Sequence, residues 1–176
     1  MSDCCAAPGS TESCNIAAGE SHAKTETRCS TCGTEGRPVE RQTVLLHVTH
    51  EHLEHVGEEA FRFCADQQCP VVYYGDGGTR FTVDEVRELI GAKVTGDARP
   101  ICYCFGFTEG DAREEIVHTG TSTIPATVSG LIKAGMCACE VRNPSGACCL
   151  GEVTRTVKRL SDEHEITDER TAGAST

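Results

Sequence analysis

The chain of 176 residues has no tryptophan and only eight aromatic residues, five Phe and three Tyr. Leu, Ile, Val and Phe together make up about 19% of it, just below the roughly 20% that, with high net charge, indicates disorder. The longest apolar runs, at residues 43–48 and 70–74, are far too short for a membrane span of about 20 residues. Something other than a hydrophobic core is therefore expected to hold this chain together, and membrane insertion is not expected.

Basic residues are also scarce. The 16 Lys and Arg stand against 27 Asp and Glu, which gives a formal net charge of −11. Affinity for nucleic acid comes mainly from Lys and Arg on phosphates, so no nucleic-acid partner is expected. The first residues, Met-Ser-Asp-Cys-Cys, lack both the basic and the apolar region of a secretory signal. We therefore expect a cytoplasmic protein.

Cysteine is what the chain has in abundance, with 13 residues. In the cytoplasm that number argues against a disulfide framework and for metal or redox chemistry. No Ser/His/Asp arrangement, phosphate-binding loop or G-x-G-x-x-G motif appears. A non-enzymatic protein without catalytic residues is therefore expected.

Apolar residues are unevenly distributed along the chain. Residues 1–38 and 161–176 contain only Ile16 and Ile166 from the Leu, Ile, Val and Phe set, so both ends are expected to be disordered. The middle of the chain is richer in apolar residues and can bury a core. The predicted fold class is α+β, divided into a disordered Cys-containing tail (1–27), a β-rich zinc-binding module (28–97), a helical module (98–161) and an acidic disordered tail (162–176).

Local patterns place the elements within these modules. β-prone runs predict strands at 40–48, 61–64, 71–74 and 79–81, with a turn at 75–78. Thr82 and Glu85 form a capping-box pattern for a helix through residue 89, and a linker is expected at 91–100. Helical patterns with start and stop signals follow at 108–118, at 123–135 and from about 150 to 160.

The first cysteine group contains two pairs. Cys29 and Cys32 form a Cys-x-x-Cys-Gly knuckle, and Cys64 and Cys69 lie between two predicted strands. Four thiolates in two such pairs are typical of a structural, tetrahedral zinc site. The alternatives are a redox pair, which favours a βαβ context that the polar segment before Cys29 does not supply, and unrelated free thiols.

Histidines gather close to this group. On a helix His47 and His50 would share a face, as would His52 and His55, so a transition-metal site is conceivable. The favoured interpretation is a polar surface helix without a ligand role, because the second cysteine pair already completes the zinc shell.

The second cysteine group has a different spacing. Cys102-Tyr-Cys104 is followed, after two predicted helices, by Cys137, Cys139 and the Cys148–Cys149 pair. A Cys-x-Cys pair fits poorly as two ligands of a small zinc knuckle, but it suits an iron–sulfur cluster, whose extended core takes thiolates from several directions. A second zinc site is the alternative.

Several motifs together carry a resemblance. They are Arg-Pro-Ile-Cys-Tyr-Cys-Phe-Gly at 99–106, Cys-Glu-Val-Arg-Asn-Pro-Ser-Gly-Ala-Cys-Cys at 139–149, and upstream the knuckle at 29–36 and the Phe-x-Phe-Cys and Val-Val-Tyr-Tyr runs. Residues 28–160 resemble the N-terminal domain of the CopZ-type iron–sulfur copper chaperones. The second half alone is similar to the bacterioferritin-associated ferredoxins, which bind a 2Fe-2S cluster.

The resemblance implies a set of ligands and a role. Zinc would be held by Cys29, Cys32, Cys64 and Cys69, and a 2Fe-2S cluster by Cys102, Cys104, Cys139 and Cys149. Cys148 is the rival to Cys149, and Cys137 the rival to Cys139. The implied function is one-electron transfer in the handling of copper or another soft metal, with a copper chaperone or copper-exporting ATPase as partner.

One departure of this sequence from the family pattern supports an alternative function. The family carries copper mainly on a C-terminal domain with a Met-x-Cys-x-x-Cys loop, and Met136-Cys-Ala-Cys139 has the wrong spacing for such a loop. The alternative function is a metal-binding or sensing adaptor that holds copper(I) through its spare cysteines, Cys4, Cys5 and Cys14. Paired thiols suit copper(I).

Overall fold

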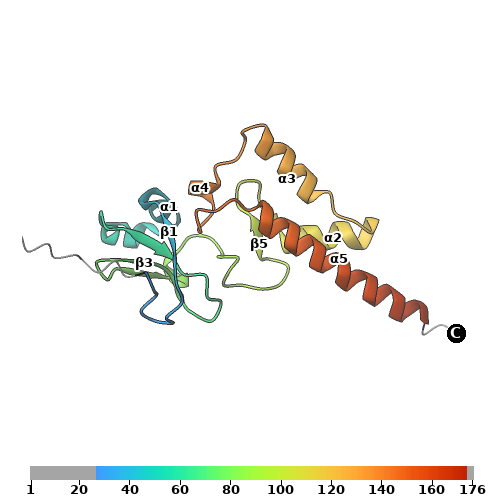
Figure 1. Cartoon of the computed structure of the whole chain (residues 1–176), viewed down its shortest axis with the longest axis horizontal. Helices are drawn as coiled ribbons and strands as arrows, with labels where there is room; N and C mark the ends of the chain where they lie inside the picture. The colour runs from blue at the N-terminus through green and yellow to red at the C-terminus, as the bar shows by residue number, and fades with distance from the viewer. Residues whose placement is uncertain (1–26, 174–176) are drawn as a thin grey trace, which may run out of the picture.

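The computed structural model describes residues 27–173. Figure 1 shows a sheet-rich part at one end of an elongated molecule and a helical part at the other. The α+β fold class predicted from the sequence is therefore confirmed. The expected tail at residues 1–27 lies, apart from Thr27, outside the described residues.

A four-stranded antiparallel sheet forms the first part, with strand order β1-β2-β3-β4. The predicted strands near residues 61, 71 and 80 are confirmed. All five residues of β3 are buried, which explains why that strand reads as a continuous apolar run. The strands are β1 (Arg37–Val39), β2 (Phe61–Phe63), β3 (Val71–Gly75) and β4 (Arg80–Thr82).

The strand predicted at 40–48 is wrong, because Arg41–His47 form the helix α1. Its buried residues, Thr43, Val44 and His47, follow helical spacing, so that one helix face covers the core. The residues after it form the short 3₁₀ helix η1 (His50–His55). The capping box of Thr82 and Glu85 is present, but it opens only the single turn η2 (Val83–Glu85).

The second part begins with the two-stranded pairing of β5 (Pro100–Cys102) and β6 (Phe107–Thr108). All three predicted helices are confirmed. Thr108 caps the first of them together with Asp111, and Gly120 ends it in the left-handed conformation with φ +76°. The helices are α2 (Glu109–Thr119), α3 (Ile124–Lys133), the single turn α4 (Cys139–Arg142) and α5 (Leu150–Gly173).

Helix α5 continues well beyond the expected end at residue 160. The prediction of a disordered tail from residue 162 is therefore wrong for residues 162–173. An i,i+4 ion pair joins Arg159 to Glu163 across this boundary, and Glu and Arg are good helix formers, so a polar segment can extend the helix without a core to cover it. Among the described residues, no helix is both long enough and apolar enough to cross a membrane.

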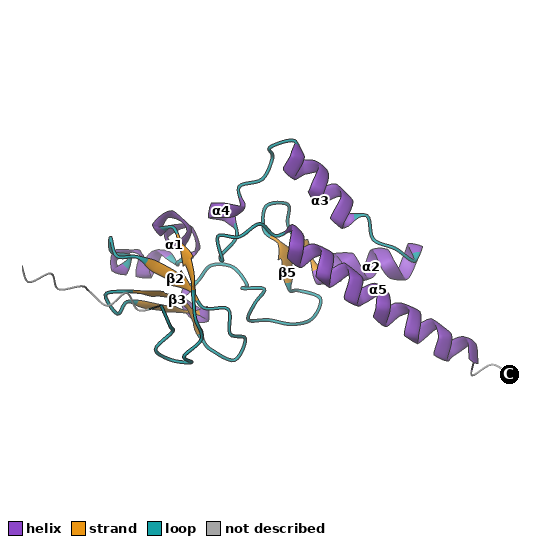
Figure 2. Cartoon of the chain, viewed as in Figure 1, coloured by secondary structure: helices purple, strands orange, loops and turns teal. Residues whose placement is uncertain are grey.

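Within the described residues, one large apolar core lies under the sheet and another among the helices, and Figure 2 shows the corresponding separation of strands from helices. The two parts meet where α1 approaches α4. Thr43 Oγ1 donates a hydrogen bond of 2.8 Å to the carbonyl of Glu140, and the Tyr73 hydroxyl donates one of 3.0 Å to the carbonyl of Pro144. His47 lies fully buried at this contact, and its burial lowers its pKa.

We expect Tyr73→Phe to lower the free energy of unfolding by about 1 kcal/mol, the usual net worth of one hydrogen bond. The substitution removes only the hydroxyl that reaches Pro144 and keeps the ring in the core. Chemical denaturation of the metal-loaded chain measures the effect. Tyr74→Phe is the matched control, since its hydroxyl donates one hydrogen bond, of 2.8 Å to the carbonyl of Thr27, within the sheet-rich part. An unchanged midpoint for Tyr73→Phe would show that this hydrogen bond does not hold the two parts together.

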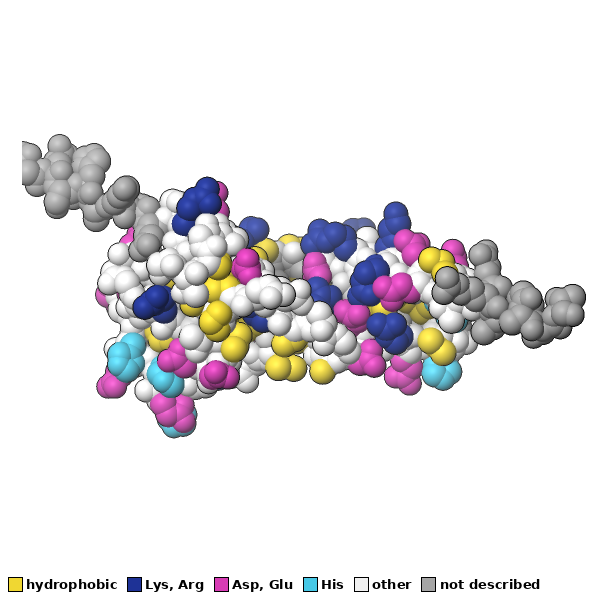
Figure 3. Space-filling model, turned by 90° about the horizontal axis from the view of Figure 1, so that it is seen from below, with side chains coloured by type: hydrophobic (Ala, Val, Ile, Leu, Met, Phe, Trp, Pro, Cys, Tyr) yellow, Lys and Arg dark blue, Asp and Glu magenta, His cyan; other side chains and the backbone are white. Residues whose placement is uncertain are grey.

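Figure 3 shows how charged side chains distribute over one face. The histidines of the sheet-rich end gather there beside acidic side chains, whereas Lys and Arg concentrate over the helical part. The surface is therefore not uniformly acidic despite the net charge of −11.

Candidate metal centres

The structure brings the first four cysteines together at one end of the two central strands of the sheet. Cys29 and Cys32 lie on a tight turn before β1, Cys64 directly follows β2, and Cys69 precedes β3. The turn closes through a 2.7 Å hydrogen bond from the amide of Gly33 to the carbonyl of Cys29. Gly33 has φ +75°, a conformation in which a side chain would be strained. The knuckle predicted from the sequence thus has the backbone that it requires.

The geometry of this group fits a zinc ion. The four sulfurs lie within 4.8 Å of one another, with 3.9 Å between Cys29 and Cys69 and 3.6 Å between Cys32 and Cys64. Tetrahedral ligands at a Zn–S distance of 2.3 Å would stand about 3.8 Å apart. The sulfurs therefore already surround a space of the right size.

Protonation of these thiols depends on their surroundings. Hydrogen bonds from Thr34 lower the pKa of Cys32 to about 7, whereas burial raises that of Cys64 to about 12 and also raises that of Cys69. Without a cation the group would thus keep most of its protons. Zinc binding must displace them, so the affinity falls as the pH falls.

The second group lies between the two parts of the molecule. Cys102 ends β5, Cys104 follows in the next turn, Cys139 begins α4, and Cys149 directly precedes α5. Three contacts join their sulfurs in a row: 3.1 Å between Cys102 and Cys149, 3.9 Å between Cys149 and Cys139, and 3.6 Å between Cys139 and Cys104. All four residues selected from the sequence are therefore neighbours.

The two rival cysteines differ from these four in exposure. Cys148 is exposed and Cys137 is half-buried, whereas Cys139 and Cys149 are buried. Within residues 27–173, neither rival makes a sulfur–sulfur contact. Adjacent residues at the start of a helix point in different directions, which is why only Cys149 of its pair faces the row.

The row is electrostatically uneven. The hydrogen bond shared by the sulfurs of Cys102 and Cys149 lowers the pKa of Cys102 to about 6 and raises that of Cys149. Burial raises the pKa of Cys139 to about 12. The amide of Ala138 donates a 3.4 Å hydrogen bond to the sulfur of Cys104, and the N-terminus of α5 adjoins Cys149, so both of these sulfurs face positive partial charge.

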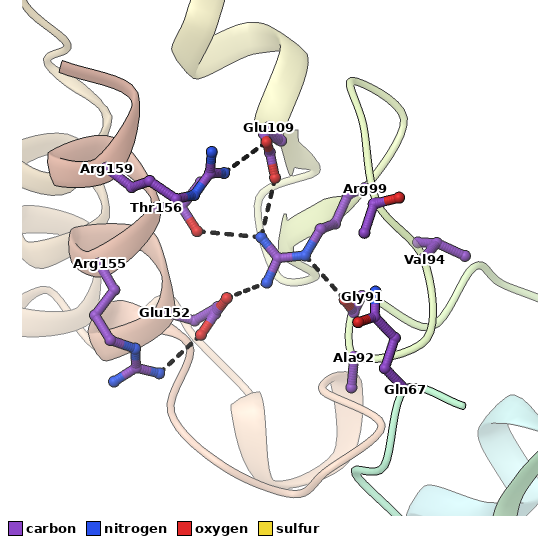
Figure 4. Close-up of a pocket in the computed structure, with 11 residues that line it drawn as sticks. Gln67, Gly91, Ala92, Val94, Arg99, Glu109, Glu152, Arg155, Thr156 and Arg159 are labelled. Carbon is purple, nitrogen blue, oxygen red and sulfur yellow. Dashed lines mark hydrogen bonds and ion pairs between the residues drawn. The ribbon is translucent and has the colours of Figure 1, made fainter. Parts of the chain in front are cut away.

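Sequence reasoning missed a charged network that ties the second group in place. Figure 4 shows the guanidinium of Arg99 surrounded by side chains from α2 and α5. It donates to Glu109 at 3.1 Å and to Thr156 at 3.2 Å, and it also pairs with Glu152. The network fixes the start of β5, which ends in Cys102, against the first turns of α5, which follow Cys149. No local sequence pattern predicts this network, because the partners of Arg99 on α5 are more than 50 residues away from it in the sequence.

We expect Arg99→Met to destabilise the helical part by about 2 kcal/mol, because it removes the charge-assisted hydrogen bond to Oε2 of the buried Glu109, whose other oxygen keeps Arg113 and Arg159. The side chain of Glu109 is only 6% exposed and that of Arg99 17%. Arg155→Met is the matched control, since Arg155 is 74% exposed and an exposed pair contributes less than about 1 kcal/mol. Denaturant titration followed by helical circular dichroism compares the two variants. Equal losses would contradict a special role for Arg99.

Comparison with known proteins agrees with this geometry. Residues 26–87 match the family of CopZ domains described as a zinc binding domain. Over 122 residues the chain is 35% identical to the copper chaperone CopZ of Archaeoglobus fulgidus, an overlap that covers 69% of this chain and 57% of that protein. The chain thus spans little more than half of that relative's length.

A solved structure extends the likeness beyond the zinc-binding domain. The X-ray structure of the N-terminal domain of Archaeoglobus fulgidus CopZ superposes with a TM-score of 0.58 at 31% identity, and the match covers 73% of this chain and 95% of that one. Through a zinc-binding domain at residues 26–87, the chain belongs to the CopZ family.

Proposed function

We propose that this protein handles copper without being an enzyme, and that it holds a 2Fe-2S cluster on Cys102, Cys104, Cys139 and Cys149. In this function it transfers single electrons that keep copper as copper(I) for a copper chaperone or a copper-exporting ATPase in the cytoplasm. The observation that carries the proposal is the row of four sulfurs from three separate elements. The name of the Archaeoglobus relative, a copper chaperone, supports the link to copper.

The shape of the row favours a cluster over a single ion. The zinc group is compact, whereas the second group is joined end to end, with Cys102 and Cys149 in one close pair and Cys104 and Cys139 in the other. A two-iron core takes its thiolates in two pairs, one for each iron. When bound, such a cluster supplies one-electron transfer.

Surrounding residues protect this position, and a cleft leads to it. Cys102, Cys139 and Cys149 are buried, and Cys104 is half-buried. A cleft between the two parts is lined by Cys148 and Cys149 together with Arg37 and Arg155. An electron donor or a copper ion could thus approach the sulfur row from this cleft without opening the core.

Anaerobic purification followed by metal, sulfide and EPR analysis tests the proposal. We expect one zinc, two irons and two sulfides per chain, and a rhombic EPR signal after reduction with dithionite. After removal of the dithionite, one equivalent of copper(II) should reoxidise the cluster and abolish that EPR signal, a readout that copper(II) reduction by free thiols does not produce. A chain that carries zinc but neither iron nor sulfide would overturn the cluster. A cluster that copper(II) does not oxidise would overturn only the link to copper.

A further inference from the structure

We propose that His52, His55 and Glu85 form a binding site for a divalent transition-metal ion on the surface of the sheet-rich part. This site is separate from both cysteine groups and goes beyond the proposed function. Its ligands come from two 3₁₀ turns, η1 and η2, that are distant in sequence and adjacent in space.

The backbone locks the two turns together. The amide of Thr49 donates a 2.9 Å hydrogen bond to the carbonyl of Glu85, and Val48 pairs with Val86 in a β-bridge. Glu85 is held further by its capping box, in which the Thr82 amide and hydroxyl donate to Oε2 at 2.7 and 2.9 Å. The other oxygen, Oε1, is left facing the imidazole of His52. The carboxylate is thereby oriented before any ligand arrives.

His52 is oriented at both ring nitrogens. Its Nδ1 shares a 3.0 Å hydrogen bond with the hydroxyl of Thr49, and its Nε2 lies 3.3 Å from Oε1 of Glu85. A hydroxyl accepts as readily as it donates, so Thr49 can hold the tautomer in which Nδ1 carries the proton and Nε2 offers a lone pair. Ligating histidines are commonly oriented by such a bond at the other nitrogen.

His55 supplies the third ligand. Residues three apart eclipse one another in a 3₁₀ helix, so the rings of His52 and His55 lie on the same side of η1, with centroids 6.3 Å apart. The side chain of His55 is 60% exposed, and rotation about its side-chain bonds can therefore turn a ring nitrogen toward Glu85. Both histidines already act on Glu85 electrostatically, although hydrogen bonds from Thr82 are the main cause of its lowered pKa.

The donor set determines the class of ion. Two imidazoles and a carboxylate suit borderline divalent metals such as copper(II), nickel(II) and zinc(II), in contrast to the soft thiolates of the cysteine groups. Among these ions copper(II) should bind most tightly. The neighbouring carboxylates of Glu51 and Glu54 add negative charge, and Figure 3 shows acidic side chains beside the histidines at this end.

Nickel(II) is the probe that tests the site, because free thiols reduce copper(II). The full chain with its zinc in place is titrated by calorimetry above pH ~7.5, where free imidazole is neutral. His52→Ala/His55→Ala should lose one equivalent of bound nickel. Thr49→Val should keep that equivalent but weaken it about tenfold, because the orienting bond is gone. His118→Ala/His164→Ala, which also removes two histidines but none from η1, should bind as the wild type does.

The same nickel titrations can also contradict the proposed site. If His52 and Glu85 form an ion pair only, the His52→Ala/His55→Ala variant will bind nickel with unchanged stoichiometry and affinity, and the proposal fails. An equal loss in the His118→Ala/His164→Ala control would likewise contradict a site on η1. Far-UV circular dichroism and zinc content, expected to be unchanged because both histidines lie at the surface, show that each variant is folded.

Discussion

Removing zinc should unfold the sheet-rich part of the chain, because the cysteine group holds the ends of the two central strands of a sheet whose own core is small. Structural zinc contributes roughly 10–16 kcal/mol of apparent folding free energy at neutral pH. The group joins β2 and β3 to the knuckle before β1, and Cys29, Cys64 and Cys69 are buried in it. Chelation, or the substitution Cys64→Ser, should therefore collapse the dispersion of the amide signals of the sheet in an NMR spectrum.

Returning zinc to the chelated wild type should restore those signals, whereas Cys64→Ser should stay unfolded at the same zinc concentration. Cys137→Ser is the matched control, since it removes a thiol that lies outside the zinc group. A sheet that keeps its dispersed signals in zinc-free protein would show that the apolar core under the sheet suffices by itself.

Replacing Cys149 by serine should abolish the iron content expected of the second group, while replacing its neighbour Cys148 should leave it intact. Cys149 is buried and contacts the sulfurs of both Cys102 and Cys139, whereas Cys148 is exposed. We expect bound iron and sulfide to fall at least tenfold in Cys149→Ser, since even changes outside the ligand shell can cost about 10–100-fold in metal affinity. Metal analysis and the EPR signal of reduced protein measure the loss.

If Cys149→Ser does not fold, Cys104→Ser tests whether the sulfur row holds the iron, because Cys104 is only half-buried and contributes less to the core. The reverse result, loss of iron with Cys148→Ser and retention with Cys149→Ser, would mean that the exposed thiol is the ligand and that the sulfur row rearranges on loading.

Most of the correct predictions came from the spacing of the cysteines and from helix-capping patterns. The Cys-x-x-Cys-Gly knuckle and the Thr108 cap are local patterns, and local patterns determine local geometry. The preference for Cys149 over Cys148 rested on a resemblance, and the structure places Cys149 in the sulfur row.

The errors have equally physical causes. Residues 40–48 contain Thr and Val, which favour strands, yet packing of Val44 and His47 against the sheet favours a helix. The extension of α5 past residue 160 depends on polar interactions that a search for apolar periodicity does not register. The Arg99 network and the pairing of His52 with Glu85 bring together residues from distant segments, and only the folded chain places them side by side.

The contact between α1 and α4 gives the protein an order of assembly. Helix α4 is a single turn of four residues, too short to persist alone, and it carries Cys139 as its first residue. Thr43 of α1 holds it through the carbonyl of Glu140, and α1 belongs to the part that zinc stabilises. The proposed site for iron thus borders a helical turn whose support from α1 we expect to form only after zinc has bound. We expect a chain deprived of zinc to be unable to take up iron, whereas a chain deprived of iron still takes up zinc.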